Sequence, residues 1–187
     1  MNYVQPIRDP EQVDQIGEIL LEDNFRDYLW WLVGIYAGLR VGDIRKLRVR
    51  DVRNKRYLEL KEQKTGMARR ILIHPVLRAA LDEWIKGKRD SELLFKSRSG
   101  YNRAITAARI YQILKAAAHK AGVKEAVGTH SMRKTFGYYM YQQERNLGFL
   151  REWFGHSSEA ITARYIGLTQ DLFDKAVRSL KIGGGKR

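Results

Sequence analysis

The chain has 187 residues, 44% of them hydrophobic and 30% charged, a balance typical of one folded domain rather than a disordered segment. Thirty-five Lys and Arg residues against 21 Asp and Glu residues give a formal net charge of +14, which favours a polyanion such as nucleic acid as partner. The sequence has no cysteine, which excludes disulfides, thiol chemistry and Cys-based zinc sites. It also has no apolar run of about 18 residues and no secretory signal, so we expect a cytoplasmic protein with no membrane partner.

The N-terminal part is predicted to begin with two helices, over residues 11–23 and 25–37. In the second, Phe25, Leu29 and Tyr36 belong to an apolar series with the 3.6-residue helical period. Gly38 is expected to end this helix and to lead into a short basic helix.

Three short runs that follow are predicted to form a small three-stranded antiparallel sheet, over residues 48–53, 57–60 and 69–73. Lys64, Thr65 and Gly66 would then form the tip that joins the last two strands.

The rest of the chain is predicted to be helical. Pro75 suits the first turn of a helix, and Gly122 suits the end of a long one. The predicted segments are a helix from Pro75, a helix over 103–121, a helix from 130 to about 143 capped by Thr129, a short helix capped by Ser157 or Ser158 that ends near Arg164, a last helix over 169–181, and a frayed tail over 183–187. The fold class is therefore α+β, mostly helical, with one domain over residues 1–182.

Positive charge is concentrated in two stretches of the sequence. Residues 1–30 carry seven acidic and two basic side chains, so the excess of positive charge lies in the rest of the chain. Residues 40–56 hold eight basic side chains against Asp43 and Asp51, and residues 96–124 hold seven and no acidic one. Such clustering is the electrostatic pattern of a surface that binds phosphates.

Several polar residues that could do chemistry are weak candidates one at a time. His130 and Arg133 are three residues apart, so they would share one face of a helix. Taken singly, Arg40 reads as a charge at a helix end, Lys64 as a solvated turn residue and Tyr165 as a core aromatic.

Taken together in their sequence order, however, these residues resemble the active-site signature of the tyrosine recombinase (phage integrase) family. The matching segments are AGLRVGDIRKL, KTG, THSMRKTFG, WFGHSS and ARYIG, and they extend over nearly the whole chain. Six residues match in type and order, with spacings of 24, 66, 3, 23 and 9 residues: Arg40, Lys64, His130, Arg133, His156 and Tyr165. The resemblance implies the catalytic domain of such an enzyme, of prokaryotic or viral origin, which breaks and rejoins DNA without a metal, a cofactor or ATP.

The resemblance also implies a role for each residue. Tyr165 would attack the scissile phosphorus to give a 3′-phosphotyrosyl bond, and Arg40 and Arg133 would bind the non-bridging oxygens. Lys64 would protonate the leaving 5′ oxygen, and His130 would move protons near the tyrosine hydroxyl. The remaining expectations are that His156 donates to a phosphate oxygen, that Asp43 orients Arg40 or His130, and that the DNA-binding set includes Arg45, Lys46, Arg98, Arg103, Arg109 and Lys134.

The sequence departs from the family pattern in two places. Family members usually carry a helical domain before the catalytic domain, which clamps the other face of the DNA. Here the catalytic-type segment starts close to Met1, so we expect that clamp domain to be absent. Lys134 stands where relatives often have a histidine.

Two alternatives to a recombinase share parts of this pattern. A type IB topoisomerase has a similar residue set but relaxes supercoils as a monomer, and an accessory module would occupy DNA with an idle active site. We expect double-stranded DNA and other protomers of a DNA-bound synapse as partners, with a monomer in free solution because of the high charge.

The last predicted helix, over 169–181, has an apolar stripe that includes Leu172, Phe173 and Val177. The stripe could cover its own domain in cis or dock on a neighbouring protomer in trans. We expect docking in trans, on DNA.

Overall fold

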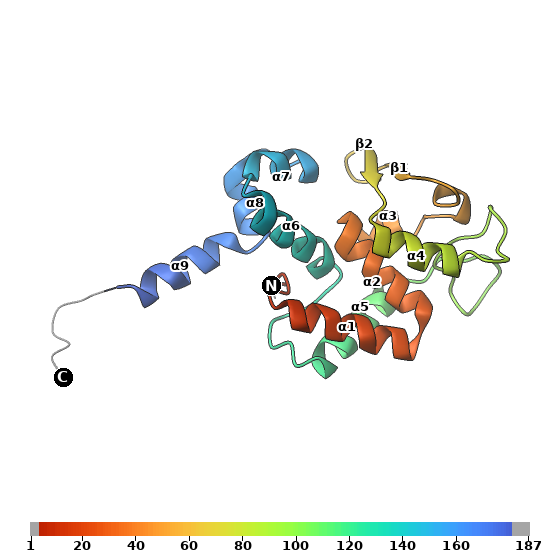
Figure 1. Cartoon of the computed structure of the whole chain (residues 1–187), viewed down its shortest axis with the longest axis horizontal. Coiled ribbons are helices and arrows are strands. Elements are labelled where there is room, and N and C mark those ends of the chain that lie inside the picture. Colours follow the sequence, from red (N-terminus) through yellow and green to blue (C-terminus); the bar gives the residue numbers. More distant parts are fainter. Residues whose placement is uncertain (1–3, 181–187) are drawn as a thin grey trace.

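Helices make up most of the fold in the computed structural model, which describes residues 4–180 (Figure 1). The elements are α1 (Pro10–Asp23), α2 (Phe25–Ala37), α3 (Val41–Ile44), the 3₁₀ turn η1 (Val49–Asp51), β1 (Tyr57–Lys61), β2 (Ala68–Leu72), α4 (Pro75–Trp84), α5 (Ala107–Lys120), α6 (Ser131–Glu144), α7 (Leu147–Phe154), α8 (Glu159–Tyr165) and α9 (Leu168–Arg178). The α+β, mostly helical class is confirmed, and the predicted tail over 183–187 lies outside the described residues. No helix within residues 4–180 is long and apolar enough to cross a bilayer.

The first two helices begin and end where their capping residues predict. Asp9 accepts a hydrogen bond from the Glu11 N–H at the start of α1, and Asn24 accepts one from the Arg26 N–H at the start of α2. Gly38 ends α2 with a left-handed φ of 59°, and a Cβ there would lie 2.4 Å from the ring of Phe136. A glycine is therefore needed for α2 to end this close to α6.

The sheet has two strands, so the predicted third strand over residues 48–53 is wrong. β1 and β2 pair antiparallel in a register that runs from Tyr57–Leu72 to Lys61–Ala68. The Asp51 carboxylate accepts a hydrogen bond from the Arg48 N–H at 2.8 Å, which curls this segment into η1. An isolated bridge between Arg48 and Leu93 is the only strand-like pairing described there.

Other boundaries differ from the predictions in ways that local capping explains. The predicted helix over 103–121 starts at Ala107, because Thr106 caps it by accepting from the Arg109 N–H. His130, and not Thr129, occupies the N-cap position of α6. Ser158 caps α8 as predicted, while α7 has no counterpart among the predicted elements.

Two hydrophobic clusters meet along α6. The main core includes side chains of α1, α2, α4 and α5 and reaches α6 at Met132. A smaller cluster joins α6, α7 and the end of α8, and consists of Phe136, Leu150, Phe154 and Ile166. Tyr165 packs against this second cluster, so the sequence motifs that flank α6 lie where the two clusters join.

α9 extends away from the rest of the molecule (Figure 1). None of its residues is buried, and Leu172, Phe173 and Val177 are 58%, 63% and 70% exposed. The apolar stripe of this helix therefore does not cover its own domain in this structure, contrary to the cis alternative.

Candidate active site

The end of α2 and the start of α6 bring Arg40 and Arg133 together. Arg40 follows the left-handed Gly38 and occupies the N-cap position of α3, and Arg133 lies in the first turn of α6. The Arg133 Nη1 atom donates to the Gly38 carbonyl at 2.5 Å. The predicted AGLR and HSMR motifs are thus joined by a direct hydrogen bond.

A buried carboxylate, Glu62, contacts the guanidinium groups of three arginines. Its side chain is 0% exposed, and its oxygens lie 2.5 Å from Arg40 Nη1, 3.2 Å from Arg69 Nε and 3.7 Å from Arg133 Nη1. The Thr65 hydroxyl donates to the same carboxylate at 2.6 Å. Burial alone would raise the pKa of Glu62, but the Thr65 hydrogen bond and the arginines outweigh it and lower the pKa.

Arg133 is the most buried of these cations, with 4% of its side chain exposed. Burial, assisted by the nearby charges of Arg40 and Arg69, lowers its pKa to about 10, so it remains charged at neutral pH. Its guanidinium also lies over the Phe154 ring, 4.7 Å from the centroid. The Arg133 Nη2 atom is buried and has no hydrogen-bond partner among the described residues.

Tyr165 and His156 lie beside each other, and the Phe154 ring contacts both of them and Arg133. Tyr165 is the last residue of α8, and its ring centroid lies 5.1 Å from that of His156 and 5.2 Å from that of Phe154. The Nδ1 atom of His156 is 3.1 Å from the hydroxyl of the buried Thr162. Thr162 therefore fixes the imidazole orientation and leaves Nε2 for another partner.

His130 and Lys64 are both exposed at the edge of this arrangement. Partial burial lowers the pKa of His130, and the positive charges of Lys134, Arg133, Lys64 and Arg40 lower it further. Lys64 lies in the turn between β1 and β2, as predicted, where Gly66 has a φ of 70°. The β1–β2 hairpin contacts α7, since the Arg69 side chain donates a hydrogen bond to the Glu152 carbonyl at 3.5 Å.

Lys134, which was expected to bind DNA, is buried in the structure. The residue is 4% exposed, and its Nζ atom donates to the Val4 carbonyl at 2.7 Å. The same atom lies over the Tyr165 ring, 5.1 Å from the centroid. Burial, with the charge of Arg8, lowers the pKa of Lys134 to about 8. Lys134 thus places a cation against the tyrosine ring instead of facing solvent.

Asp43 also has a different partner from the predicted one. It is buried in α3, and its carboxylate accepts a hydrogen bond from the Gln63 N–H at 2.9 Å. Within the described contacts it therefore fixes the backbone of the β1–β2 turn rather than the side chain of Arg40 or His130.

The remaining predicted DNA-binding residues fall into two groups. Arg45 is partly buried and donates to the Ile105 carbonyl at 2.6 Å, which ties α3 to the segment before α5. The exposed group consists of Lys46, Arg98, Arg103 and Arg109. The exposed side chains are available to meet phosphates, whereas the Arg45 side chain is already engaged in the fold.

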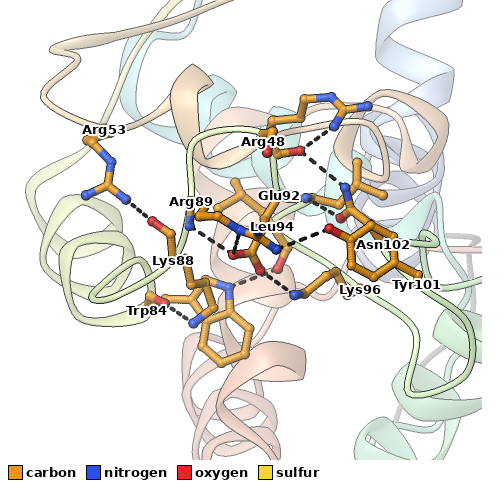
Figure 2. Close-up of polar contacts among 12 residues, drawn as sticks. Arg48, Arg53, Trp84, Lys88, Arg89, Glu92, Leu94, Lys96, Tyr101 and Asn102 are labelled. Atoms are coloured by element: carbon orange, nitrogen blue, oxygen red, sulfur yellow. Dashed lines mark hydrogen bonds and ion pairs between the residues drawn. The ribbon is translucent and has the colours of Figure 1, made fainter.

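The loop over residues 85–106, which precedes α5 and is rich in basic side chains, is ordered by a network of polar contacts (Figure 2). We refer to it as the basic loop. The half-buried Glu92 carboxylate accepts from the Lys96 ammonium and from the Arg89 N–H, the latter at 2.9 Å. These two interactions lower the pKa of Glu92 to about 2. Asn102 accepts from the Leu93 N–H at 2.9 Å, and the hydroxyl of the exposed Tyr101 accepts from Arg89 at 3.1 Å.

Sequence reasoning missed Glu62 and Arg69, although a signal for both was present. Leu58, Leu60 and Glu62 alternate along β1 and just beyond it, so a charged residue continues an inward-facing series. Arg69 precedes the buried Ile71 by two residues on β2 and therefore shares its face. Two opposite charges on the inward face of one hairpin predict a buried ion pair.

The comparisons with known proteins agree with the motifs. The sequence profile of the phage integrase family matches residues 8–171. The probable integrase/recombinase YoeC of Bacillus subtilis (strain 168) is 42% identical over 171 residues, which cover 91% of this chain and 93% of the relative. The tyrosine recombinase XerA of Pyrococcus furiosus is 28% identical over 170 residues. The aligned region covers 89% of this chain but 59% of that relative.

Solved structures share the fold at lower sequence identity. A crystal structure of XerA recombinase superimposes with a TM-score of 0.73 at 22% identity, covering 95% of this chain and 66% of that one. A post-cleavage complex of XerH recombinase with a palindromic difH substrate gives 0.72 at 20% identity, covering 95% and 54%. A lambda integrase dimer on a COC′ core site gives 0.68 at 16% identity, covering 98% and 52%. The chain therefore spans about half to two-thirds of the length of these recombinases.

Proposed function

The chain belongs to the phage integrase family, and from that premise we propose that it is a site-specific DNA recombinase that cuts and rejoins strands through a covalent bond to Tyr165. The observation that carries the proposal is the convergence of Arg40 and Arg133 on one buried carboxylate, close to Tyr165 and His156. A guanidinium offers paired donors that match the oxygens of a phosphate.

The phenolic oxygen of Tyr165 is the nucleophile in this proposal. It forms a bond to the scissile phosphorus while the bond from phosphorus to the 5′ oxygen breaks, and the DNA is left with a 3′-phosphotyrosyl end and a free 5′ hydroxyl. The 5′ oxygen of a strand then attacks the phosphotyrosyl bond and releases Tyr165. Because the covalent intermediate conserves the phosphodiester bond energy, rejoining needs no ATP.

Two protons move during cleavage, and the site has a group for each. His130 accepts the tyrosine proton, because its lowered pKa keeps the imidazole neutral at pH 7. Lys64 donates a proton to the leaving 5′ oxygen from the turn between β1 and β2. His156 binds a phosphate oxygen through Nε2, since Thr162 lies against Nδ1.

Arg40 and Arg133 neutralise the charge that develops on the non-bridging oxygens. This is the role that metal ions have in many other phosphoryl-transfer enzymes, and preorganised donors supply it without a metal. The Arg133 Nη2 atom, which has no hydrogen-bond partner among the described residues, is the donor that we assign to the phosphate.

The exposed basic residues bind the DNA backbone around the cleavage point. Lys46, Arg98, Arg103 and Arg109 would each release counterions on contact with phosphates, so binding should weaken steeply with salt. DNA also supplies the negative charge that lets protomers with a net charge of +14 assemble, and we propose a monomer in free solution that acts in the prokaryotic cytoplasm.

α9 is the element that we assign to contacts between protomers. Its exposed Leu172, Phe173 and Val177 form an apolar face that no described part of the chain covers. Docking of this face on a neighbouring protomer would bury it and couple two active sites.

A nicked suicide substrate, from which the leaving strand diffuses away, tests the proposed function. The unaltered chain should form a covalent protein–DNA adduct, and Tyr165→Phe should form none while binding DNA with unchanged affinity, because affinity depends mainly on phosphate contacts. A salt-sensitive complex without an adduct would instead identify an accessory DNA-binding protein. Relaxation of supercoiled DNA without recombinant product would identify a topoisomerase.

A further inference from the structure

Within residues 4–180, Glu62 is the one carboxylate in contact with both of the proposed phosphate-binding arginines. It follows β1 on the inward face of the hairpin, and it accepts the Thr65 hydroxyl on the same oxygen that faces Arg40. Its other oxygen faces Arg69 at 3.2 Å and Arg133 at 3.7 Å. One buried side chain therefore links α3, α6 and the turn that carries Lys64.

The charges in this cluster do not cancel. Three guanidinium groups surround one carboxylate, so the cluster keeps an excess of positive charge. Moreover, the Nη2 atoms of Arg69 and Arg133 are buried and have no hydrogen-bond partner among the described residues. Buried donors are nearly always satisfied in folded proteins, so two unsatisfied guanidinium donors in one cluster point to a partner of opposite charge. These donors indicate a site that is complete only when an anion is bound.

We propose that Glu62 is a positioning residue for strand cleavage, which holds the Arg40 and Arg133 guanidinium groups in the arrangement that one phosphate requires. The inference rests on the proposed function. Without the carboxylate, the three guanidinium groups would repel one another in a poorly solvated space and would separate before DNA arrives. Through Thr65, the same carboxylate also fixes the turn from which Lys64 reaches the leaving oxygen.

This role has a signature that separates it from a simple structural one. Glu62 lowers the positive charge of the site, so its presence weakens the attraction for the DNA phosphate while improving the geometry of the reaction. Loss of the carboxylate should therefore leave DNA affinity unchanged or increase it, and should slow the chemical step. A residue needed only for folding would lower stability and DNA affinity together.

Glu62→Gln in the full chain tests the proposal, because the amide keeps the size of the side chain and removes its charge. We expect covalent trapping at saturating suicide substrate to slow by about 10-fold or more, as for a small displacement of a reacting group. The apparent Kd from a band shift should stay the same or fall. Glu59→Gln is the matched control, because Glu59 lies on β1 three residues before Glu62 and pairs with Arg70 on the surface at 3.3 Å. It should trap DNA at the unaltered rate.

Glu62→Asp keeps the charge and withdraws the carboxylate by one methylene group, so its trapping rate should lie between those of Glu62→Gln and the unaltered chain. It also replaces Glu62→Gln as the deciding variant if the latter does not fold. An unaltered trapping rate in either folded variant would overturn the inference and leave the proposed function intact. A parallel loss of thermal stability and DNA affinity would likewise overturn it. If the unaltered chain itself formed no adduct, the proposed function would fail, and the inference with it.

Discussion

Glu62 and Glu92 are two glutamates with similar partners and different surroundings. Both accept interactions from at least one arginine and one other donor, and both have a lowered pKa. Glu62 is buried, and the Nη2 atoms of Arg69 and Arg133 beside it have no hydrogen-bond partner within residues 4–180. Glu92 lies on the exposed basic loop, where Lys96 and the Arg89 N–H bind it directly (Figure 2).

The comparison indicates that the degree of burial determines whether spare donors in such a charged cluster are solvated by water or left without a partner. On the exposed loop, water solvates the spare donors of Lys96 and Arg89, so the cluster serves to order the loop. In the buried cluster, we propose that an incoming anion satisfies the remaining donors. Similar residue types would then order a loop in one place and bind an anion in the other.

The largest effect is expected from Arg133→Lys. A lysine keeps the charge but not the planar pair of donors, so covalent trapping should fall by about 100-fold, the loss typical of one preorganised donor. Arg89→Lys makes the same change at the Glu92 cluster and should leave the trapping rate at saturating DNA within about 2-fold, as expected for a surface pair. Equal losses in the two variants would remove the distinction between the clusters.

A smaller effect is expected from Thr65→Val, which removes the hydroxyl that joins Glu62 to the turn of Lys64. The change preserves the shape of the side chain and frees the turn, so trapping should slow by about 10-fold through poorer placement of the acid. A substrate with a bridging sulfur, whose thiolate leaves without an acid, should restore most of the rate. If the sulfur substrate gave no recovery, Thr65 would act on the arginines instead.

Glu92→Gln should change the loop and not the chemistry. The pKa of Glu92 is about 2, below its unfolded value, so the stabilising contribution is complete above pH 4.5 and is lost as the pH falls toward 2. The Tm of this variant should be lower than that of the unaltered chain by a few degrees at most at pH 7, and the gap should narrow as the pH falls from 4.5 toward 2. A gap that does not change with pH would mean that Glu92 acts through something other than its charge.

The smallest effect concerns the histidines. Burial and the charges of Arg133 and Arg40 lower the pKa of His156, and a larger set of cations does the same for His130. Both imidazoles should titrate below 6.5 in proton NMR spectra of the DNA-free protein. Arg133→Gln should raise both midpoints by a fraction of a unit, since one nearby cation is removed. Unchanged midpoints would show that the buried cluster has little excess charge.

Most of the fold was predictable because its helix boundaries depend on local signals. Asn24 and Gly38 set the limits of α2, and Ser158 sets the start of α8. Residues 48–53 were misread because their alternating pattern suits a strand, while the Asp51–Arg48 hydrogen bond turns the chain. α7 was missed although its local signals were present, since Asn146 caps its start by accepting from the Phe149 N–H and a left-handed Gly155 ends it.

The motif residues of the candidate site could be predicted from the sequence. The contacts that their side chains make inside the fold could not. The six predicted residues follow from their order in the sequence. In the structure, Arg40 and Arg133 contact Glu62, and His156 and Tyr165 lie beside Phe154. The burial of Lys134 could not be predicted, because it depends on the Val4 carbonyl, which lies 130 positions away in the sequence. The hydrogen bond of Arg45 could not be predicted either, since its partner Ile105 lies 60 positions away.

The link between Tyr165 and α9 makes the last helix a lever. Only Ile166 and Gly167 separate the tyrosine from α9, and Gly167 has a φ of 81° and packs against Pro6 and Arg8. An 11-residue helix is about 16 Å long, so a rotation of about 10° at Gly167 moves its far end by about 3 Å. Arg8 braces the pivot through its 2.8 Å ion pair with Asp171. A displacement of the far end of α9 would therefore also move the backbone of Tyr165, the proposed nucleophile, because only two residues separate them.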